Sequence, residues 1–216
     1  LSKKMKNAQG IALVGLGHVG RATLRLLKER QRQIESRLGV ALTLRWLCDH
    51  RPKGKTNGIA LFRDTKITTD FSSILDDPNV NIVIELIGGL GHARRLLLGA
   101  LNRGKHVITA NKLLLANCWE EILEASRKHG GHVFYEAAVA SAIPIIRSIR
   151  EGLVSSKITE IRGILNGTTN FILSRMLDNQ MPYRQALEKA QQLGFAEANP
   201  TLDVNGTDTV HKLSIL

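Results

Sequence analysis

Apolar runs alternate with amphipathic stretches along the first two thirds of the chain. The run IALVGLG, residues 11–17, contains no polar side chain, as is typical of a strand buried on both faces of a parallel sheet. Further candidate strands are LTLRWLCD (42–49), TKITTD (65–70), NIVIELIG (81–88), HVITAN (106–111) and HVFYEAAV (132–139). Strands in alternation with helices predict an α/β fold with a doubly wound parallel sheet of the Rossmann type.

The helical pattern is clearest directly after the first strand. Residues 21–39 place Leu27, Ile34 and Leu38 on one apolar stripe, and Gly39 is a plausible carboxyl-terminal cap, so a single helix is predicted there. Further helical segments are predicted at 71–77, 92–103 and 117–129.

The pattern changes near Pro144. Residues 157–168 alternate between apolar and polar side chains, which predicts a strand with one covered face. Residues 170–179 and 181–194 have helical patterns, with Pro182 in the first turn of the second helix. These patterns predict a Rossmann domain over residues 1–145 and an incomplete α+β domain over residues 146–216.

The motif GLGHVG places Gly15, Gly17 and Gly20 in the G-x-G-x-x-G spacing, between a predicted strand and a predicted helix. In dinucleotide-binding folds the first glycine permits a tight turn, the second admits the pyrophosphate, and the third lets helix and strand pack closely. His18 and Val19 lie inside the loop, where the helix start offers N–H groups to an anion. The motif favours NAD or NADP binding over glycines that serve only a turn.

Asp49 ends the second predicted strand, where an acid can bind the adenosine ribose of NAD. His50, Arg51 and Lys53 follow it and are suited to the 2′-phosphate of NADP, although an exposed basic turn would give the same pattern. The sequence leaves the choice between NAD and NADP open.

The net charge of +11 raises the question of nucleic-acid binding. Residues 1–55 hold 13 Lys and Arg against 3 Asp and Glu, while aromatic residues make up only 4% of the chain. A solvated basic helix face explains this distribution better than a nucleic-acid site, which usually adds exposed aromatic side chains. Two cysteines, no recognisable signal peptide and no long apolar stretch predict a cytoplasmic protein without a membrane span.

Several long motifs resemble homoserine dehydrogenase, in the order found in that family: ELIGG (85–89), HVITANK (106–112), EAAVASAIPII (136–146), GILNGTTNFIL (163–173) and AQQLGFAEANPTLDVNGTDTVHKL (190–213). The resemblance implies an NAD- or NADP-dependent oxidoreductase that interconverts L-homoserine and L-aspartate 4-semialdehyde, in the biosynthesis of threonine, methionine and isoleucine. It implies a second domain for substrate binding and dimerisation, and a full-length protein that is a homodimer or larger. It also implies that relatives continue beyond the position of Leu216.

The resemblance assigns site residues in three groups. The catalytic candidates are Lys112 and Lys212, since oxidation of an alcohol needs a base and a lysine accepts the proton when burial or a second cation lowers its pKa. The substrate-binding candidates are Glu197, Asp208, Asp203, Gly167 and Thr168, while Phe195 stands where some relatives have tyrosine. The cofactor-binding candidates are Gly15, Gly17, His18, Val19, Gly20, Asp49, Arg51, Gly88, Gly89, Asn111 and Lys112.

A monovalent cation site is also implied by the resemblance. Glu136 would supply a carboxylate, and Val139, Ser141 and Ile143 backbone carbonyls, to a sodium ion. A plain connection between two domains is the alternative.

Asp208 and Lys212 also have a simpler interpretation. They stand four residues apart on a predicted helix, where an exposed ion pair contributes only about 0.3–0.5 kcal/mol. Two other functions fit the glycine loop equally well: another amino-acid dehydrogenase on the same fold, and a nucleotide-binding module without catalytic activity.

Overall fold

The computed structural model describes residues 8–52, 54, 56, 61–140 and 142–216. The chain divides into two compact units, Leu1–Ala138 and Val139–Leu216. The division falls shortly before Pro144, where the sequence pattern changes. Each unit is described by itself.

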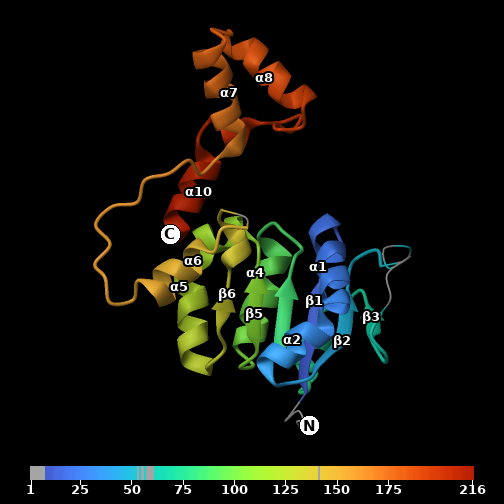
Figure 1. Ribbon diagram of the computed structural model, residues 1–216. Helices are drawn as coiled ribbons and strands as arrows, with labels where there is room; N and C mark the ends of the chain where they lie inside the picture. Colours follow the sequence, from blue (N-terminus) through green and yellow to red (C-terminus); the bar gives the residue numbers. More distant parts are fainter. Residues whose placement is uncertain (1–7, 53, 55, 57–60, 141) are drawn as a thin grey trace. The chain divides into compact units, whose positions relative to one another are not determined.

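The first unit is built on one parallel sheet with helices packed on it (Figure 1). The strands run in the order β3-β2-β1-β4-β5-β6, and the order reverses between β1 and β4. The predicted doubly wound sheet is therefore confirmed. The strands are β1 Gln9–Val14, β2 Leu42–Cys48, β3 Lys66–Thr68, β4 Ile82–Glu85, β5 His106–Thr109 and β6 Val133–Phe134.

Five α-helices and a short 3₁₀ helix belong to the described part of this unit: α1 His18–Glu29, α2 Gln31–Leu38, α3 Ser72–Asp76, α4 Gly91–Leu101, α5 Lys112–His129 and η1 Glu136–Ala138. Leu24 of α1 packs into a buried cluster with Leu13 of β1 and Leu44 and Leu47 of β2. Burial of these side chains stabilises the layers by roughly 1.5–3 kcal/mol each.

The prediction of one helix over residues 21–39 was wrong in one respect. The helix breaks at Arg30, which has φ −99° and ψ 6°, and α2 begins at Gln31. After the break, the Glu35 side chain accepts a hydrogen bond of 2.7 Å from the Leu42 N–H at the start of β2. This tertiary bond fixes α2 against the sheet, and no periodic pattern encodes it. Gly39 caps α2 in the left-handed region, as predicted.

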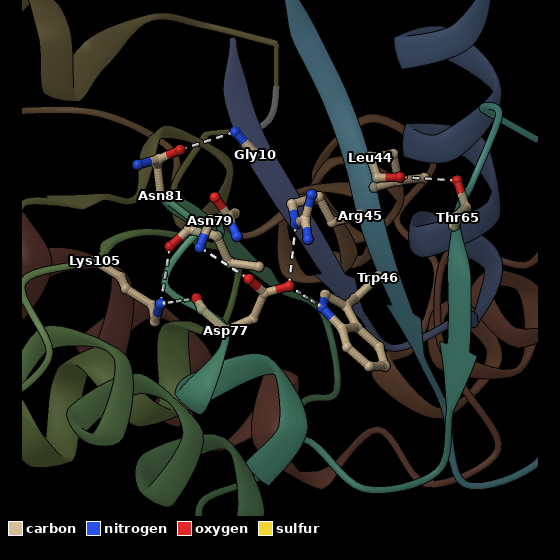
Figure 2. A network of polar contacts seen from close by, with 10 residues as sticks. Gly10, Leu44, Arg45, Trp46, Thr65, Asp77, Asn79, Asn81 and Lys105 are labelled. Carbon is tan, nitrogen blue, oxygen red and sulfur yellow. Dashed lines mark hydrogen bonds and ion pairs between the residues drawn. The ribbon is translucent and has the colours of Figure 1, made fainter. Parts of the chain in front are cut away.

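A polar network stabilises the edge of the sheet at which the parallel strands begin (Figure 2). Asp77 accepts hydrogen bonds of 3.0 Å from Arg45 and 2.8 Å from the Trp46 indole. Although burial opposes ionisation, bonds from Trp46, the Asn79 N–H and Arg45 lower the pKa of Asp77 to about 2. Lys105 donates to the carbonyls of Asp77 and Val80, so this loop is tied to both β2 and the start of β5.

The second unit is helical in the described residues. It contains α6 Ile145–Arg147, the π-helix η2 Ser148–Gly152, α7 Gly167–Asp178, α8 Tyr183–Gln192, α9 Thr201–Val204 and α10 Thr207–Ile215. Helices α7 and α8 form a hairpin that buries Ile172, Ala186 and Ala190 (Figure 1). Pro182 stands at the start of α8, as the sequence predicts.

The predicted strand at 157–168 was wrong. Residues 157–166 form no strand, and Gly167 and Thr168 belong to α7. A strand needs backbone partners, and the described residues of this unit contain no other strand with which to pair. The alternating pattern is visible in the sequence, but it leaves Ile158 42% and Ile164 74% exposed. Across both units, the helices that the structure describes include none with the length and apolar character needed to span a bilayer.

Candidate functional site

The glycine loop joins β1 to α1 at the carboxyl edge of the sheet, beside the reversal in strand order. Gly15 has a φ of 102°, and a Cβ atom there would lie 2.4 Å from the carbonyl oxygen of Leu86. A Cβ atom on Gly20 would lie 1.9 Å from the carbonyl oxygen of Gly15. By contrast, a Cβ atom on Gly17 would meet nothing within 4 Å. The first and third glycines therefore allow the loop to pack, while the second leaves open surface at the helix start.

The start of α1 is suited to an anion. His18 and Val19 are exposed in its first turn, which carries no acidic residue. Unpaired N–H groups and the positive end of the helix dipole favour a phosphate at such a position. Gly17, with no side chain, lets a pyrophosphate approach this backbone closely. The residues present thus fit a dinucleotide.

Asp49 follows β2 and is only 6% exposed. Its Oδ2 accepts a hydrogen bond of 2.7 Å from the Leu16 N–H in the glycine loop. Its Oδ1 accepts a bond of 2.8 Å from the Arg51 N–H and lies 3.3 Å from Nδ1 of His50. Asp49 therefore ties the glycine loop to β2, a role that the sequence does not reveal. Arg51 is exposed beside it, and Lys53 lies outside the described residues.

A second network joins the loops after β4 and β5. Glu85 is fully buried; its Oε1 accepts bonds from the N–H groups of Ile87 and Gly88, and its Oε2 accepts the hydroxyl hydrogen of Thr109 at 2.6 Å. Gly88 and Gly89 have φ values of 77° and 69°, which bend the loop after β4. Glu85 thus holds the loop after β4, which contains the predicted cofactor residues Gly88 and Gly89, through hydrogen bonds to its backbone.

Asn111 connects the same loop to the start of α5. Its side-chain amide donates 2.7 Å to the carbonyl oxygen of Gly89, and its Oδ1 caps α5 by accepting from the Leu114 N–H. Lys112 is the first residue of that helix and is partly exposed. Gly88, Gly89, Asn111 and Lys112 therefore lie together at the carboxyl edge, where ligands bind in doubly wound sheets.

The second unit holds an ion pair between a partly buried lysine and a buried aspartate. Nζ of Lys212 lies 2.7 Å from Oδ2 of Asp208, and the two side chains are 20% and 4% exposed. Nζ also donates 2.7 Å to the carbonyl oxygen of Leu165. Asp208 is further held by Asn166, whose amide donates 2.8 Å to the same Oδ2 atom. The interpretation as an exposed surface pair is therefore wrong, because tertiary contacts enclose this helix face.

The other acidic candidates differ in their surroundings. Asp203 accepts a bond of 2.8 Å from the Asn166 amide, so it lies beside the ion pair. Glu197 is exposed, and no hydrogen bond or ion pair of its carboxylate is found among the described residues. Two carboxylates thus share one amide partner, while the carboxylate of Glu197 has no protein partner in the described part of the chain.

The turn before α7 supplies the remaining substrate candidates. Thr168 is buried and donates its hydroxyl hydrogen to the carbonyl oxygen of Phe195 at 2.6 Å. Gly167 begins α7, and a Cβ atom there would meet nothing within 4 Å. Phe195 stacks on Phe171 at 4.6 Å between ring centroids. Thr168 therefore has a structural partner for its hydroxyl, whereas Gly167 leaves open space.

The candidate cation residues fall in a bent segment. Glu136 lies in η1, Val139 is buried and Ile143 is exposed, while Ser141 lies outside the described residues. Ala140 and Ala142 adopt φ values of 49° and 69°, which few residues other than glycine adopt. In the described part of the chain, no three His, Cys, Asp or Glu side chains are grouped as a metal site.

Three residues that hold the candidate site residues in place are not singled out by the sequence: Glu85, Thr109 and Asn166. Glu85 ends an otherwise apolar strand, and a charged residue in such a run must find partners when buried. Asn166 directly precedes a helix, which is a capping signal. These signals were present in the sequence, but they do not name the partners.

Comparison with known proteins follows the same division of the chain. A family model described as the NAD binding domain of homoserine dehydrogenase matches residues 15–136, and one described as homoserine dehydrogenase matches residues 144–216. The homoserine dehydrogenase of Bacillus subtilis is 40% identical over 206 residues, which cover 95% of this chain and 47% of that protein. The chain spans about half the length of the curated relatives that it matches.

Solved structures give the same result. A homoserine dehydrogenase from Thiobacillus denitrificans matches with a TM-score of 0.86 and 41% identity, over 96% of this chain and 47% of that one. A hyperthermophilic archaeal homoserine dehydrogenase in complex with NADPH matches with a TM-score of 0.80 and 26% identity, over 97% and 68%. The resemblance found in the motifs is confirmed by these matches.

Proposed function

The chain belongs to the homoserine dehydrogenase family, and from that premise we propose that the protein containing it interconverts L-homoserine and L-aspartate 4-semialdehyde with NAD or NADP. The observation that carries the proposal is the enclosed Asp208–Lys212 pair. An exposed pair at this spacing contributes little to stability, whereas a pair held by Asn166 and Leu165 has a defined geometry suited to a substrate site.

The glycine loop and the start of α1 would hold the pyrophosphate. Gly88, Gly89 and Asn111 line the neighbouring edge, where the nicotinamide half would lie. The cofactor accepts or donates the hydride when bound. The structure of an archaeal relative contains NADPH. In this chain both carboxylate oxygens of Asp49 already accept backbone hydrogen bonds, which makes Asp49 less suited to bind the ribose hydroxyl of NAD. We therefore favour NADP, with Arg51 at its 2′-phosphate.

The cluster in the second unit would hold the amino acid. The carboxylates of Glu197, Asp203 and Asp208 suit the substrate ammonium group. In the oxidation of homoserine, a lysine would accept the hydroxyl proton; in the reverse direction that lysine would donate the proton to the aldehyde oxygen. We assign the proton to Lys212 and the orientation of the reacting oxygen to Lys112. Gly167 would let the substrate approach the start of α7.

Three further assignments belong to the full-length protein. We propose that it is a homodimer or a larger homo-oligomer, that it works in the cytoplasm, and that it acts in the biosynthesis of threonine, methionine and isoleucine. From the family resemblance we also propose that Glu136 and the backbone carbonyls of Val139, Ser141 and Ile143 bind a sodium ion. The left-handed backbone at Ala140 and Ala142 supports a specialised loop there.

The test is a spectrophotometric assay of the full-length protein. Oxidation of NADPH and of NADH is followed with aspartate 4-semialdehyde as the substrate. We expect turnover with at least one cofactor and faster turnover with NADPH. Cofactor binding without any turnover of the semialdehyde would contradict the proposed activity and favour a nucleotide-binding module.

A further inference from the structure

Both polar atoms of the Asn166 side-chain amide, Oδ1 and Nδ2, make hydrogen bonds. Its Oδ1 accepts from the N–H of Thr169 at 2.8 Å and from the hydroxyl of the same residue at 3.0 Å. Its Nδ2 donates to Oδ1 of Asp203 and to Oδ2 of Asp208, both at 2.8 Å. Asn166 is itself only 4% exposed. One side chain therefore caps α7 and joins two carboxylates that lie in α9 and α10.

This set of partners fixes the orientation of the amide. Only the nitrogen can donate to two carboxylates, and only the oxygen can accept from an N–H group. An aspartate would retain the cap but lose both donors, while a serine would retain the cap and offer a single hydroxyl hydrogen. The position therefore requires an amide for a reason that capping alone does not provide.

Asn166 and the residue before it, Leu165, also hold the Asp208–Lys212 ion pair. Oδ2 of Asp208 accepts from both Asn166 and Lys212, and Nζ of Lys212 donates to the carbonyl oxygen of Leu165, the residue before Asn166. Leu165 and Asn166 thus fix both members of the ion pair from one side. A displacement of Asn166 would move Asp208 and, through it, the ammonium group of Lys212.

The charges explain why this arrangement needs support. Asp203 and Asp208 bring two negative charges to one amide, and Lys212 supplies one positive charge. Like charges at short range disfavour each other unless donors lie between them. The amide of Asn166 occupies that position without adding charge, which leaves a net negative cluster suited to a cationic group.

We propose that Asn166 is a positioning residue for homoserine: it sets the separation of the Asp203 and Asp208 carboxylates and thereby fixes Lys212. The inference rests on the proposed function for its substrate and on contacts within the second unit for its geometry. It predicts that loss of the amide impairs use of the amino-acid substrate and leaves dinucleotide binding unchanged.

Two variants separate positioning from capping in the full-length protein. Asn166→Ser and Asn166→Asp both retain a side-chain cap for α7. Asn205→Ser is the matched control, because Asn205 is an exposed residue whose side chain accepts from the N–H of Thr207. If capping alone mattered, Asn166→Asp would behave at least as well as Asn166→Ser, since an acid is favourable at a helix start.

The first measurement is steady-state kinetics. We expect Asn166→Ser to raise KM for homoserine by about 10-fold, as loss of a hydrogen bond to a charged group would predict, with KM for NADPH altered by less than about 2-fold. We expect a larger loss for Asn166→Asp, because it adds a third carboxylate to the cluster. Unchanged homoserine kinetics in both variants, or an Asn166→Asp enzyme better than Asn166→Ser, would overturn the inference.

The second measurement needs no activity. Acetic anhydride labels accessible amines, and mass spectrometry reports the labelling of Lys212 relative to exposed Lys157 in the same molecule. We expect Lys212 to be labelled about 3-fold faster or more in Asn166→Ser, as its pair with Asp208 loosens, and unchanged in Asn205→Ser. Equal labelling in wild type and Asn166→Ser would refute the positioning role. If the wild-type protein fails to turn over the semialdehyde while the labelling result holds, the proposed function fails and the geometric inference stands.

Discussion

The hydroxyl of Thr109 donates a hydrogen bond of 2.6 Å to Oε2 of Glu85, at the ends of two neighbouring parallel strands. Glu85 uses its other oxygen to hold the N–H groups of Ile87 and Gly88. The Asn111 N–H in turn donates to the Thr109 hydroxyl oxygen at 3.0 Å. One buried carboxylate and one hydroxyl therefore fix two loops that belong to the proposed cofactor site.

The substitution Thr109→Val tests this network. It retains the shape of the side chain but leaves one buried oxygen of Glu85 without its donor, which costs about 1–3 kcal/mol. We expect a lower free energy of unfolding in urea and weaker NADPH binding. Thr109→Ser keeps the hydroxyl and serves as the control; similar losses in both variants would point to the missing methyl group instead.

Substitution by alanine should affect stability at Gly20 and cofactor affinity at Gly17. In Gly20→Ala, the new Cβ atom would press against the carbonyl oxygen of Gly15, so we expect a loss of about 1–3 kcal/mol in unfolding free energy. In Gly17→Ala, the Cβ atom meets nothing in the protein, so stability should be retained while NADPH affinity falls. Urea denaturation and fluorescence titration of NADPH measure the two effects. Tight NADPH binding by Gly17→Ala would argue against a pyrophosphate at this loop.

Arg51 provides a test of cofactor preference. Its side chain is exposed beside Asp49, and a 2′-phosphate there would gain a charge-assisted hydrogen bond. We expect Arg51→Ala to raise KM for NADPH about 10-fold and to leave KM for NADH almost unchanged. Equal effects on both cofactors would assign Arg51 to a general electrostatic role, and cofactor binding by Arg51→Ala would then depend less on salt than binding by the wild type.

Lys212 carries the proposed proton transfer. In the full-length protein we expect Lys212→Met to lower kcat for both directions by a factor of about 100 or more, with NADPH binding retained. The dinucleotide is assigned to the first unit, so its fluorescence titration controls for the folding of that unit, and urea denaturation controls for the second unit, which contains Lys212. A Lys212→Met enzyme with wild-type kcat would remove this residue from the mechanism.

Acid stability should depend on Asp77. Its pKa falls to about 2 in the folded protein, while an unfolded aspartate titrates near 3.9. The contribution of this carboxylate is therefore present above pH 4 and is lost as the pH falls from about 4 to about 2, by up to about 2 kcal/mol. We expect Asp77→Asn to reduce stability at pH 7 and to flatten the stability curve across that interval. The free energy of unfolding is measured by urea denaturation at several pH values. If it depends on pH between about 4 and about 2 in the same way in Asp77→Asn and the wild type, the assigned pKa of Asp77 is contradicted.

Much of the first unit could be predicted because its signals are local. Buried parallel strands require apolar runs, and the glycine spacing follows from the backbone of one turn, so β1, Gly15 and Gly20 are visible in the sequence. The alternation at residues 157–168 was misleading for the opposite reason. An alternating pattern expresses a preference for pairing, but a strand forms only when another strand supplies the hydrogen bonds.

The sequence by itself determined the family, the doubly wound sheet, the glycine loop and the identities of Asp208 and Lys212 as candidates. Only the tertiary structure decided what those residues contact: that Asp49 holds the glycine loop, that Glu85 bonds Thr109, and that Asn166 joins Asp203 to Asp208. The physical reason is that periodicity and motif spacing act within a few residues along the chain. The polar partners lie 24 to 42 residues apart, and only the folded backbone brings their donors and acceptors within hydrogen-bonding distance.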